Sequence, residues 1–310
     1  LPQLTEDQPA HRPLIAAHAV PWPGEMAVFR SPSTDGFELL TTFGSRARIG
    51  TLVSDFYAGP ISRFDLGNAL VVDLLTGTLE SVTDLTLFGG ANALAIESAP
   101  GVWEIVQAGA ADLIAPGRYR LTRLLRGQRG TESAMGNSAP SGARVVMLDD
   151  SLASLPIAEA DLGIPWNWRI GPASWPVSDE TYVAQAFTPE GIGLRPFSVA
   201  HVEQPWRRPR TTGDLTIRWI RRSRALSADS WGGLDAPLGE ELEAYEVEIL
   251  DGAAVKRVLS ATTTSAVYTA AQQTTDWGAL LGPGDALDIR IFQISALLGR
   301  GAPKTVTLTL

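Results

Sequence analysis

Turn-forming residues divide this chain into short segments, and no other feature limits its possible folds as strongly. The 310 residues include 30 glycines and 21 prolines, which supply tight turns and interrupt helices and central strands. Apolar residues make up 45% of the chain and charged residues 19%, so ordinary globular cores can still be buried. Short strands joined by many turns satisfy both observations. The sequence predicts an all-β protein, with weak helical patterns at 108–114 and 150–159.

The first half of the chain is predicted to contain a lead-in and a β-rich domain. Five prolines within residues 1–24 fix φ and remove hydrogen-bond donors, so we expect an extended linker from an upstream part of the polypeptide and no sheet element. In residues 25–150, short apolar or alternating runs between turn residues predict strands. These runs are 26–29, 37–43, 70–75, 85–88, 93–96, 102–107, 119–125 and 143–148.

Residues 151–193 are predicted to form an ordered connector. They combine five prolines with Trp166, Trp168 and Trp175, and this density of rigid turns and large rings indicates packing against neighbouring parts. The single strand expected within the connector spans 182–187.

Residues 194–310 show a regular strand pattern. Leu215, Ile217 and Trp219 alternate with Thr216 and Arg218, so one face of this strand is apolar and the other polar. Several such short strands with turns between them are typical of an antiparallel, fibronectin type III-like β-sandwich. The expected strands are 197–202, 215–220, 244–250, 255–260, 266–269, 286–295 and 305–310.

Charge and cysteine content exclude several classes of protein. The formal net charge is −9, and basic and acidic residues balance from Leu194 onward, so the surplus lies in the earlier part. A chain of this charge lacks the overall basic character of nucleic-acid-binding proteins, and we expect no direct nucleic-acid binding. The absence of cysteine excludes disulfides and thiolate metal sites. The start has neither an initiator Met nor a signal pattern, so we expect a piece of a longer polypeptide.

Motifs for catalysis are not found. The sequence contains no phosphate-binding P-loop, no Gly-x-Ser-x-Gly elbow and no dinucleotide fingerprint. His11, His18 and His201 lack the spacing of zinc ligands. Acidic pairs such as Asp149-Asp150 stand in turn-like contexts and do not suggest the acid and base of a glycosidase. We expect no enzyme, no cofactor and no metal site.

Arginine clusters and one tryptophan are the candidate contact residues. Arginines interleaved with aromatic residues can bind anionic sugars or nucleic acid, but pairing with acidic residues across subunit interfaces is the favoured interpretation. Trp231, in a Ser-Trp-Gly-Gly loop, is the best candidate for stacking on a sugar. The candidate surface or interface residues are Arg118, Arg120, Arg126, Arg129, Arg207, Arg208, Arg210 and Trp231.

Several stretches together resemble a known family. They are WEIVQ at 103–107, APGRYRL at 115–121, LLRGQRGTE at 124–132, GIGLRP at 191–196 and LTIRWIRR at 215–222. With these stretches, residues 80–310 resemble the C-terminal region of the large tail-tip proteins of gene transfer agents and of related host-specificity proteins in long-tailed phages.

The resemblance implies a role in contact and assembly. It implies a baseplate or tail-tip component, associated with the tail hub and present as a trimer around the tail axis of an extracellular particle. Its partners would be copies of itself, other tail proteins and a receptor or glycan on the recipient cell. The alternative is a carbohydrate-binding module that recognises a cell-surface glycan, and a third hypothesis, an enzyme that acts on wall polymers, predicts turnover that we do not expect.

Overall fold

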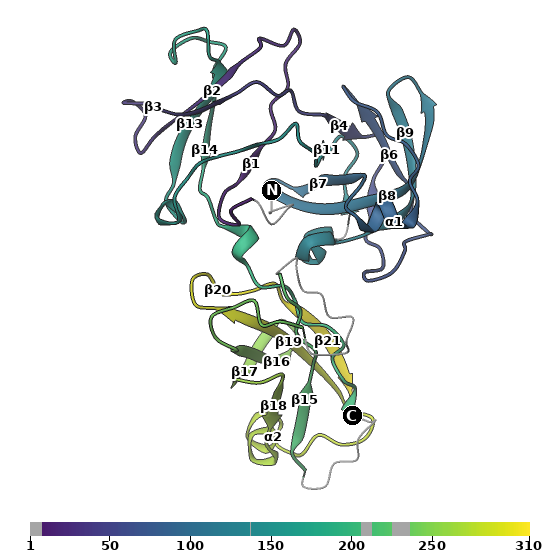
Figure 1. Ribbon diagram of the computed structural model, residues 1–310. Helices are drawn as coiled ribbons and strands as arrows, with labels where there is room; N and C mark the ends of the chain where they lie inside the picture. Colours follow the sequence, from purple (N-terminus) through teal and green to yellow (C-terminus); the bar gives the residue numbers. More distant parts are fainter. Residues whose placement is uncertain (1–7, 137, 206–212, 225–235) are drawn as a thin grey trace. The chain divides into compact units, whose positions relative to one another are not determined.

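The computed structural model describes residues 8–136, 138–205, 213–224 and 236–310. The chain divides into two compact units, Leu1–Gly193 and Leu194–Leu310, and each is described by itself (Figure 1). Strands account for 42% of the structure and helices for 10%, which confirms the all-β prediction. No helix in the described ranges is long and apolar enough to cross a membrane.

A closed antiparallel barrel is the main feature of the first unit. Its strands follow the order β11-β4-β6-β9-β8-β7, and β11 pairs with both β4 and β7. Closure leaves the barrel without free sheet edges. The strands are β4 (Ile49–Leu52), β6 (Leu70–Leu74), β7 (Ala93–Ala99), β8 (Val102–Ala115), β9 (Arg118–Leu125) and β11 (Arg144–Met147).

Alternation of apolar and polar residues explains how these strands enclose a core. In β6, Leu70, Val72 and Leu74 are buried, whereas Val71 and Asp73 are partly exposed. Each large apolar side chain removed from water contributes about 1.5–3 kcal/mol. Gly50 lets β4 lie close to β6, because a Cβ at this position would clash with the backbone of Asp73.

Two local predictions for the barrel region are wrong. Residues 85–88, expected as a strand, belong to helix α1 (Asp84–Phe88), where the hydroxyl of Thr83 accepts a hydrogen bond from the Thr86 backbone N–H. Residues 108–114, expected as weakly helical, continue β8 and pair with β9. In the first case a local cap decides the structure, and in the second the long hairpin outweighs weak local preference.

A second sheet of the first unit has the order β14-β13-β2-β3 (Figure 1). Its strands are β2 (Met26–Ser31), β3 (Glu38–Phe43), β13 (Trp166–Pro172) and β14 (Val183–Phe187). Trp168 of β13 is buried against Val28, and its Nε1 donates to the backbone oxygen of Phe187 at 3.0 Å. Strand β14 was expected, but β13 was not, because its tryptophans and flanking prolines obscure any alternation.

The lead-in also contributes to the first unit, contrary to expectation. Strand β1 (Leu14–Ile15) pairs with β12 (Ala153–Ser154), and Nε2 of His11 lies 3.1 Å from the backbone oxygen of Ile157. The weak helix expected at 150–159 is wrong, because this stretch holds β12 and only the first residue of a 3₁₀ turn. Smaller elements are β5 (Phe56–Tyr57), β10 (Ser138–Ala139) and the 3₁₀ turns η1 (Gln128–Gly130), η2 (Glu132–Met135), η3 (Glu159–Asp161) and η4 (Ile192–Leu194).

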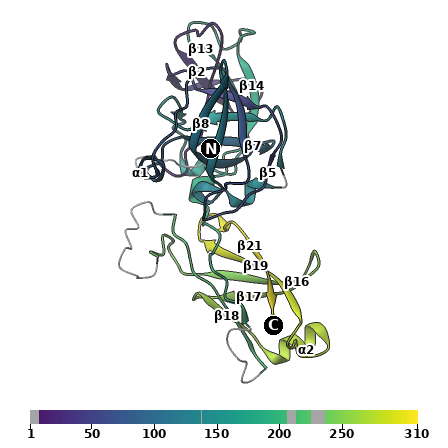
Figure 2. The same ribbon diagram turned by 90° about the vertical axis from the view of Figure 1, so that its right-hand side faces the viewer.

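The second unit is an antiparallel sandwich (Figures 1 and 2). One sheet pairs β15 with β18, and the other has the order β17-β16-β19, with β20 and β21 both pairing with β19. Side chains from both sheets, including Ile217, Trp219, Val247 and Ile289, pack in one core. The strands are β15 (Leu215–Arg218), β16 (Tyr245–Asp251), β17 (Ala254–Ala261), β18 (Ser265–Tyr268), β19 (Ala286–Ser295), β20 (Gly299–Arg300) and β21 (Lys304–Thr309).

Two details of the sandwich differ from expectation. The strand expected at 197–202 is represented by an isolated bridge between Ala200 and Ile220. Helix α2 (Ala270–Trp277) was not expected, although its Thr269 cap and the left-handed Gly278 at its end are typical boundary residues.

Candidate functional site

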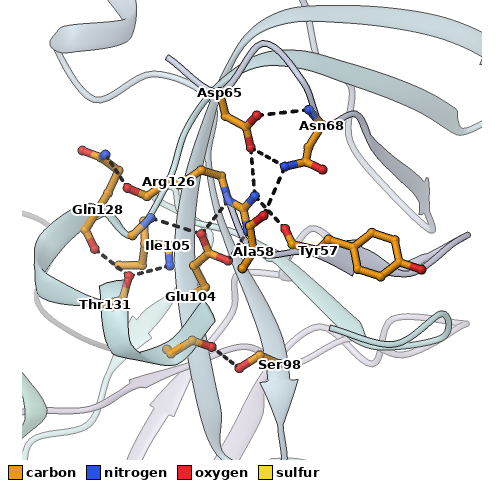
Figure 3. Close-up of polar contacts among 12 residues, drawn as sticks. Tyr57, Ala58, Asp65, Asn68, Ser98, Glu104, Ile105, Arg126, Gln128 and Thr131 are labelled. Carbon is orange, nitrogen blue, oxygen red and sulfur yellow. Dashed lines mark hydrogen bonds and ion pairs between the residues drawn. The ribbon is translucent and has the colours of Figure 1, made fainter. Parts of the chain in front are cut away.

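A buried cluster of charges lies in the first unit beside the barrel strands β8 and β9. Nε and Nη2 of Arg126 donate to the two carboxylate oxygens of Glu104, at 2.7 and 2.9 Å. Nη1 of Arg126 donates to Asp65 Oδ2 at 3.1 Å and to the backbone oxygen of Tyr57 at 2.9 Å. The side chains of Arg126, Asp65 and Glu104 are 1%, 2% and 3% exposed. Figure 3 shows how the guanidinium lies between the two carboxylates.

The end of β9 places Arg126 at this position. β9 ends at Leu125, and Gly127 then takes a left-handed conformation with φ of 56°, which glycine adopts without strain. The Gly127 backbone N–H donates to Glu104 Oε1 at 3.1 Å. Four residues on, Thr131 Oγ1 accepts from the Ile105 backbone N–H at 2.9 Å. The LLRGQRGTE stretch thus folds back on the WEIVQ stretch of β8.

The second carboxylate is held by its own loop. Asp65 Oδ1 accepts hydrogen bonds from the backbone N–H groups of Gly67 and Asn68, and Asp65 Oδ2 accepts from the Asn68 side chain at 2.8 Å. Burial alone would raise the pKa of Asp65. The hydrogen bonds from Asn68, Arg126 and Gly67 outweigh this effect, so the pKa lies below its ordinary value.

An aromatic ring completes the surroundings of Arg126. The guanidinium carbon lies 3.8 Å from the centre of the Phe56 ring, a distance suited to cation–π attraction. With both carboxylates bound to Arg126 and removed from solvent, the cluster is suited to fixing the backbone segments around it. Breaking a buried pair of this kind costs about 3–5 kcal/mol, because the remaining charge stays buried.

The structure changes the prediction for one arginine of this region. Arg126 was expected at a surface or interface, but it is 1% exposed and bound to carboxylates of its own chain. The reason is that the strand ends one residue earlier, so Arg126 turns inward beside β8. Its partners Glu104 and Asp65 were not predicted. The available signal was Glu104, the single charged residue of the mostly apolar WEIVQ stretch.

The other candidates in the same run lie nearer the surface. Arg118 binds Asp73 through two hydrogen bonds, of 2.6 and 2.7 Å, and these hold the pKa of Asp73 below its ordinary value. Arg120 is exposed and lies opposite Asp112 in the β8–β9 hairpin. Arg129 is partly exposed and has φ of 56°. Arg118 therefore has an acidic partner in its own chain.

The remaining candidates, Arg207, Arg208, Arg210 and Trp231, lie outside the described residues. Neighbouring arginines of the second unit pair within the chain: Arg221 with Glu243 at 3.0 Å and Arg224 with Glu240 at 2.7 Å. Within the described ranges, no group of three or more His, Asp or Glu side chains is arranged to hold a metal ion.

The chain is an all-β protein of two compact units. Its barrel unit contains a buried arginine–carboxylate cluster. Residues 47–146 match the model of a protein family described as "Rcc01698-like, C-terminal", a family name associated with gene transfer agents. The match begins two residues before β4 and ends within β11, so it spans the barrel and contains the whole cluster.

A comparison with curated proteins and one with a marsupial T cell receptor structure do not identify a relative of this chain. No curated protein matches the chain. A solved structure of a marsupial T cell receptor aligns with 96% of this chain and 95% of that chain, at 9% identity and a TM-score of 0.13, which is too low to indicate a shared fold.

Proposed function

We propose that this chain is a structural component of a phage-like tail tip or baseplate of the gene transfer agent type. It would contribute to tail-tip assembly and to attachment to, or penetration of, the recipient bacterial envelope. The observation that carries the proposal is the family match over residues 47–146, because this segment is a complete structural element, the closed barrel.

The contacts of the barrel support the proposal. Two stretches that carry the resemblance to tail-tip proteins, 103–107 and 124–132, supply Glu104 and Arg126, which bind each other in the cluster. The resemblance therefore involves residues that interact physically and fix one another's backbone. This contact supports a shared barrel as the core of the proposed role.

Assembly and surroundings complete the proposed role. Copies of the chain would associate with one another, as a trimer around the tail axis, and with other tail proteins in an extracellular particle assembled in the bacterial cytoplasm. The sandwich would present its loops for contact with neighbouring subunits or the recipient surface. No catalytic step is part of this role.

Imaging of tagged particles tests the proposal. An epitope inserted at Gly252, an exposed position in the turn between β16 and β17, lies outside the strands of the sandwich. We expect antibody to this epitope to label one end of the tail in electron micrographs. Label on the particle head, or particles that lack the tagged chain, would contradict the proposed role.

A further inference from the structure

Strand β14 forms an exposed edge of the β14-β13-β2-β3 sheet. It pairs with β13 on one side, and no described residue pairs with the other side. All of its residues, Val183-Ala184-Gln185-Ala186-Phe187, are exposed, with Val183 at 65% and Phe187 at 38%. An edge strand of this kind presents unpaired N–H and C=O groups to any strand that approaches.

Nothing in the sequence of β14 prevents such pairing. Proteins usually protect their edges with charged residues, proline or bulges. β14 has no charge and no proline, and its register with β13 runs from Trp166–Phe187 to Ile170–Val183 without interruption.

Two other edge strands carry protective features. In the sandwich, β17 contains Lys256 and Arg257 and has an irregular register with β16. At the opposite edge of the same sheet as β14, β3 begins with Glu38 and has an irregular register with β2. Among these edges β14 is therefore the one best suited to accept a partner strand.

We infer that β14 pairs with β14 of a second copy of this chain, antiparallel about a two-fold axis at Gln185. In this register Val183 lies opposite Phe187, Ala184 opposite Ala186, and Gln185 opposite itself. Apolar side chains meet apolar ones, small meet small, and two amides meet at the axis, where they can exchange hydrogen bonds. A contact in which the same patch serves both subunits is the usual form of a two-fold interface.

The inference goes beyond the tail-tip role and does not depend on it. A two-fold contact uses a different surface from a contact that builds a three-fold ring, so copies using both would associate in multiples of six. The contact is small compared with a standard interface of about 20–30 residues a side. We therefore expect weak, concentration-dependent pairing.

A single cysteine tests the register. Because the full chain contains no cysteine, Gln185→Cys supplies its sole thiol. Opposite residues in an antiparallel pair have Cα atoms about 4.5–5.5 Å apart, within the range of a disulfide. We expect a disulfide-linked dimer under mild oxidation at about 0.1 mM protein, a concentration suited to a weak contact. The matched control is Thr42→Cys, exposed on β3, which should remain largely monomeric.

Three outcomes would overturn the inference. Equal cross-linking of Thr42→Cys would indicate random collision. Preferential linkage of Gln185→Cys to Thr42→Cys in a mixture of the two would indicate head-to-tail pairing of β14 with β3. Absence of dimer from Gln185→Cys would show that the edges do not meet.

A charge at the axis provides a second test that needs no oxidation. Gln185→Lys places two ammonium groups opposite each other, and an exposed edge strand tolerates lysine. We expect the dissociation constant of the dimer, measured by sedimentation equilibrium, to rise at least about tenfold. Thr42→Lys should leave it unchanged. An unchanged dissociation constant for Gln185→Lys would place the contact elsewhere.

Discussion

Both units of this chain contain arginine–carboxylate pairs, but the arginine is buried in the barrel unit and partly exposed in the sandwich. In the barrel unit, Arg126 and its carboxylates are buried and the pairs are inaccessible to solvent. In the sandwich, Arg290 and Arg300 bind Glu248 at 2.7 and 2.6 Å on the face of the sheet that points away from the core. The Glu248 side chain is only 4% exposed, but the two arginines are 35% and 43% exposed.

This difference determines how much stability is lost when one partner of a pair is removed. A buried pair must be complete, because either partner alone is an uncompensated charge in a medium of low polarity. An exposed arginine that loses its partner is solvated by water. We therefore expect the barrel to be far more sensitive than the sandwich to the loss of one charge.

The largest expected effect comes from removing the central cation. Arg126→Met should lower the free energy of unfolding of the first unit by about 3–5 kcal/mol, because Glu104 and Asp65 stay buried without their partner. Urea denaturation of the full chain, followed by hydrogen exchange in each unit, measures the loss. Arg120→Met, at an exposed position of β9, should change it by less than about 0.5 kcal/mol. Equal effects of the two substitutions would contradict a structural role for the cluster.

A smaller loss in the free energy of unfolding is expected from a substitution that crowds the cluster but removes no charge. A Cβ at Gly59 would clash with Asp65 Oδ2 and lie 2.7 Å from Arg126 Nη1, so Gly59→Ala should cost about 1–3 kcal/mol. Gly67→Ala is the matched control, since its Cβ would lie 3.8 Å from the other oxygen of Asp65. Gly59→Ala should lower the thermal unfolding midpoint of the first unit, whereas Gly67→Ala should leave it unchanged. A fall with both would mean that the loop, and not the cluster, is sensitive.

The pH dependence sharpens the comparison further. Because the pKa of Asp65 is lower in the folded protein than its ordinary value of 3.8, its ionised form adds stability above that value, and this stability is lost as the pH falls through the folded pKa. Asp65→Asn should therefore be less stable than the native chain at pH 7, by about 1–2 kcal/mol. The difference should shrink below about pH 4. A difference that stays constant between pH 7 and pH 3 would show that the charge of Asp65 is not what stabilises the loop.

The sequence predicted the sandwich better than the first unit, and the reason is physical. In strands such as β16 and β19, the apolar residues that face the core alternate with polar ones, and the expected positions agree with the structure within one or two residues. Turn chemistry likewise located the end of β9. The inward position of Arg126 depends on Glu104 and Asp65, 22 and 61 residues away, and no local pattern shows such pairing. β13 was missed because its pairing with β2 and β14 overrides a composition typical of turns.

The smallest expected effect belongs to the sandwich pairs, in which the arginines are partly exposed. Arg300→Met removes the hydrogen bonds to Glu246 and Glu248, but Glu248 keeps its bond to Arg290. The expected loss in the free energy of unfolding of the second unit is therefore at most about 1 kcal/mol. Because salt screens exposed charges, raising the salt concentration should reduce this loss, whereas the loss caused by Arg126→Met should persist. Urea denaturation at low and at 1 M salt compares the two variants directly, and a similar salt response in both would mean that the barrel cluster is accessible to solvent.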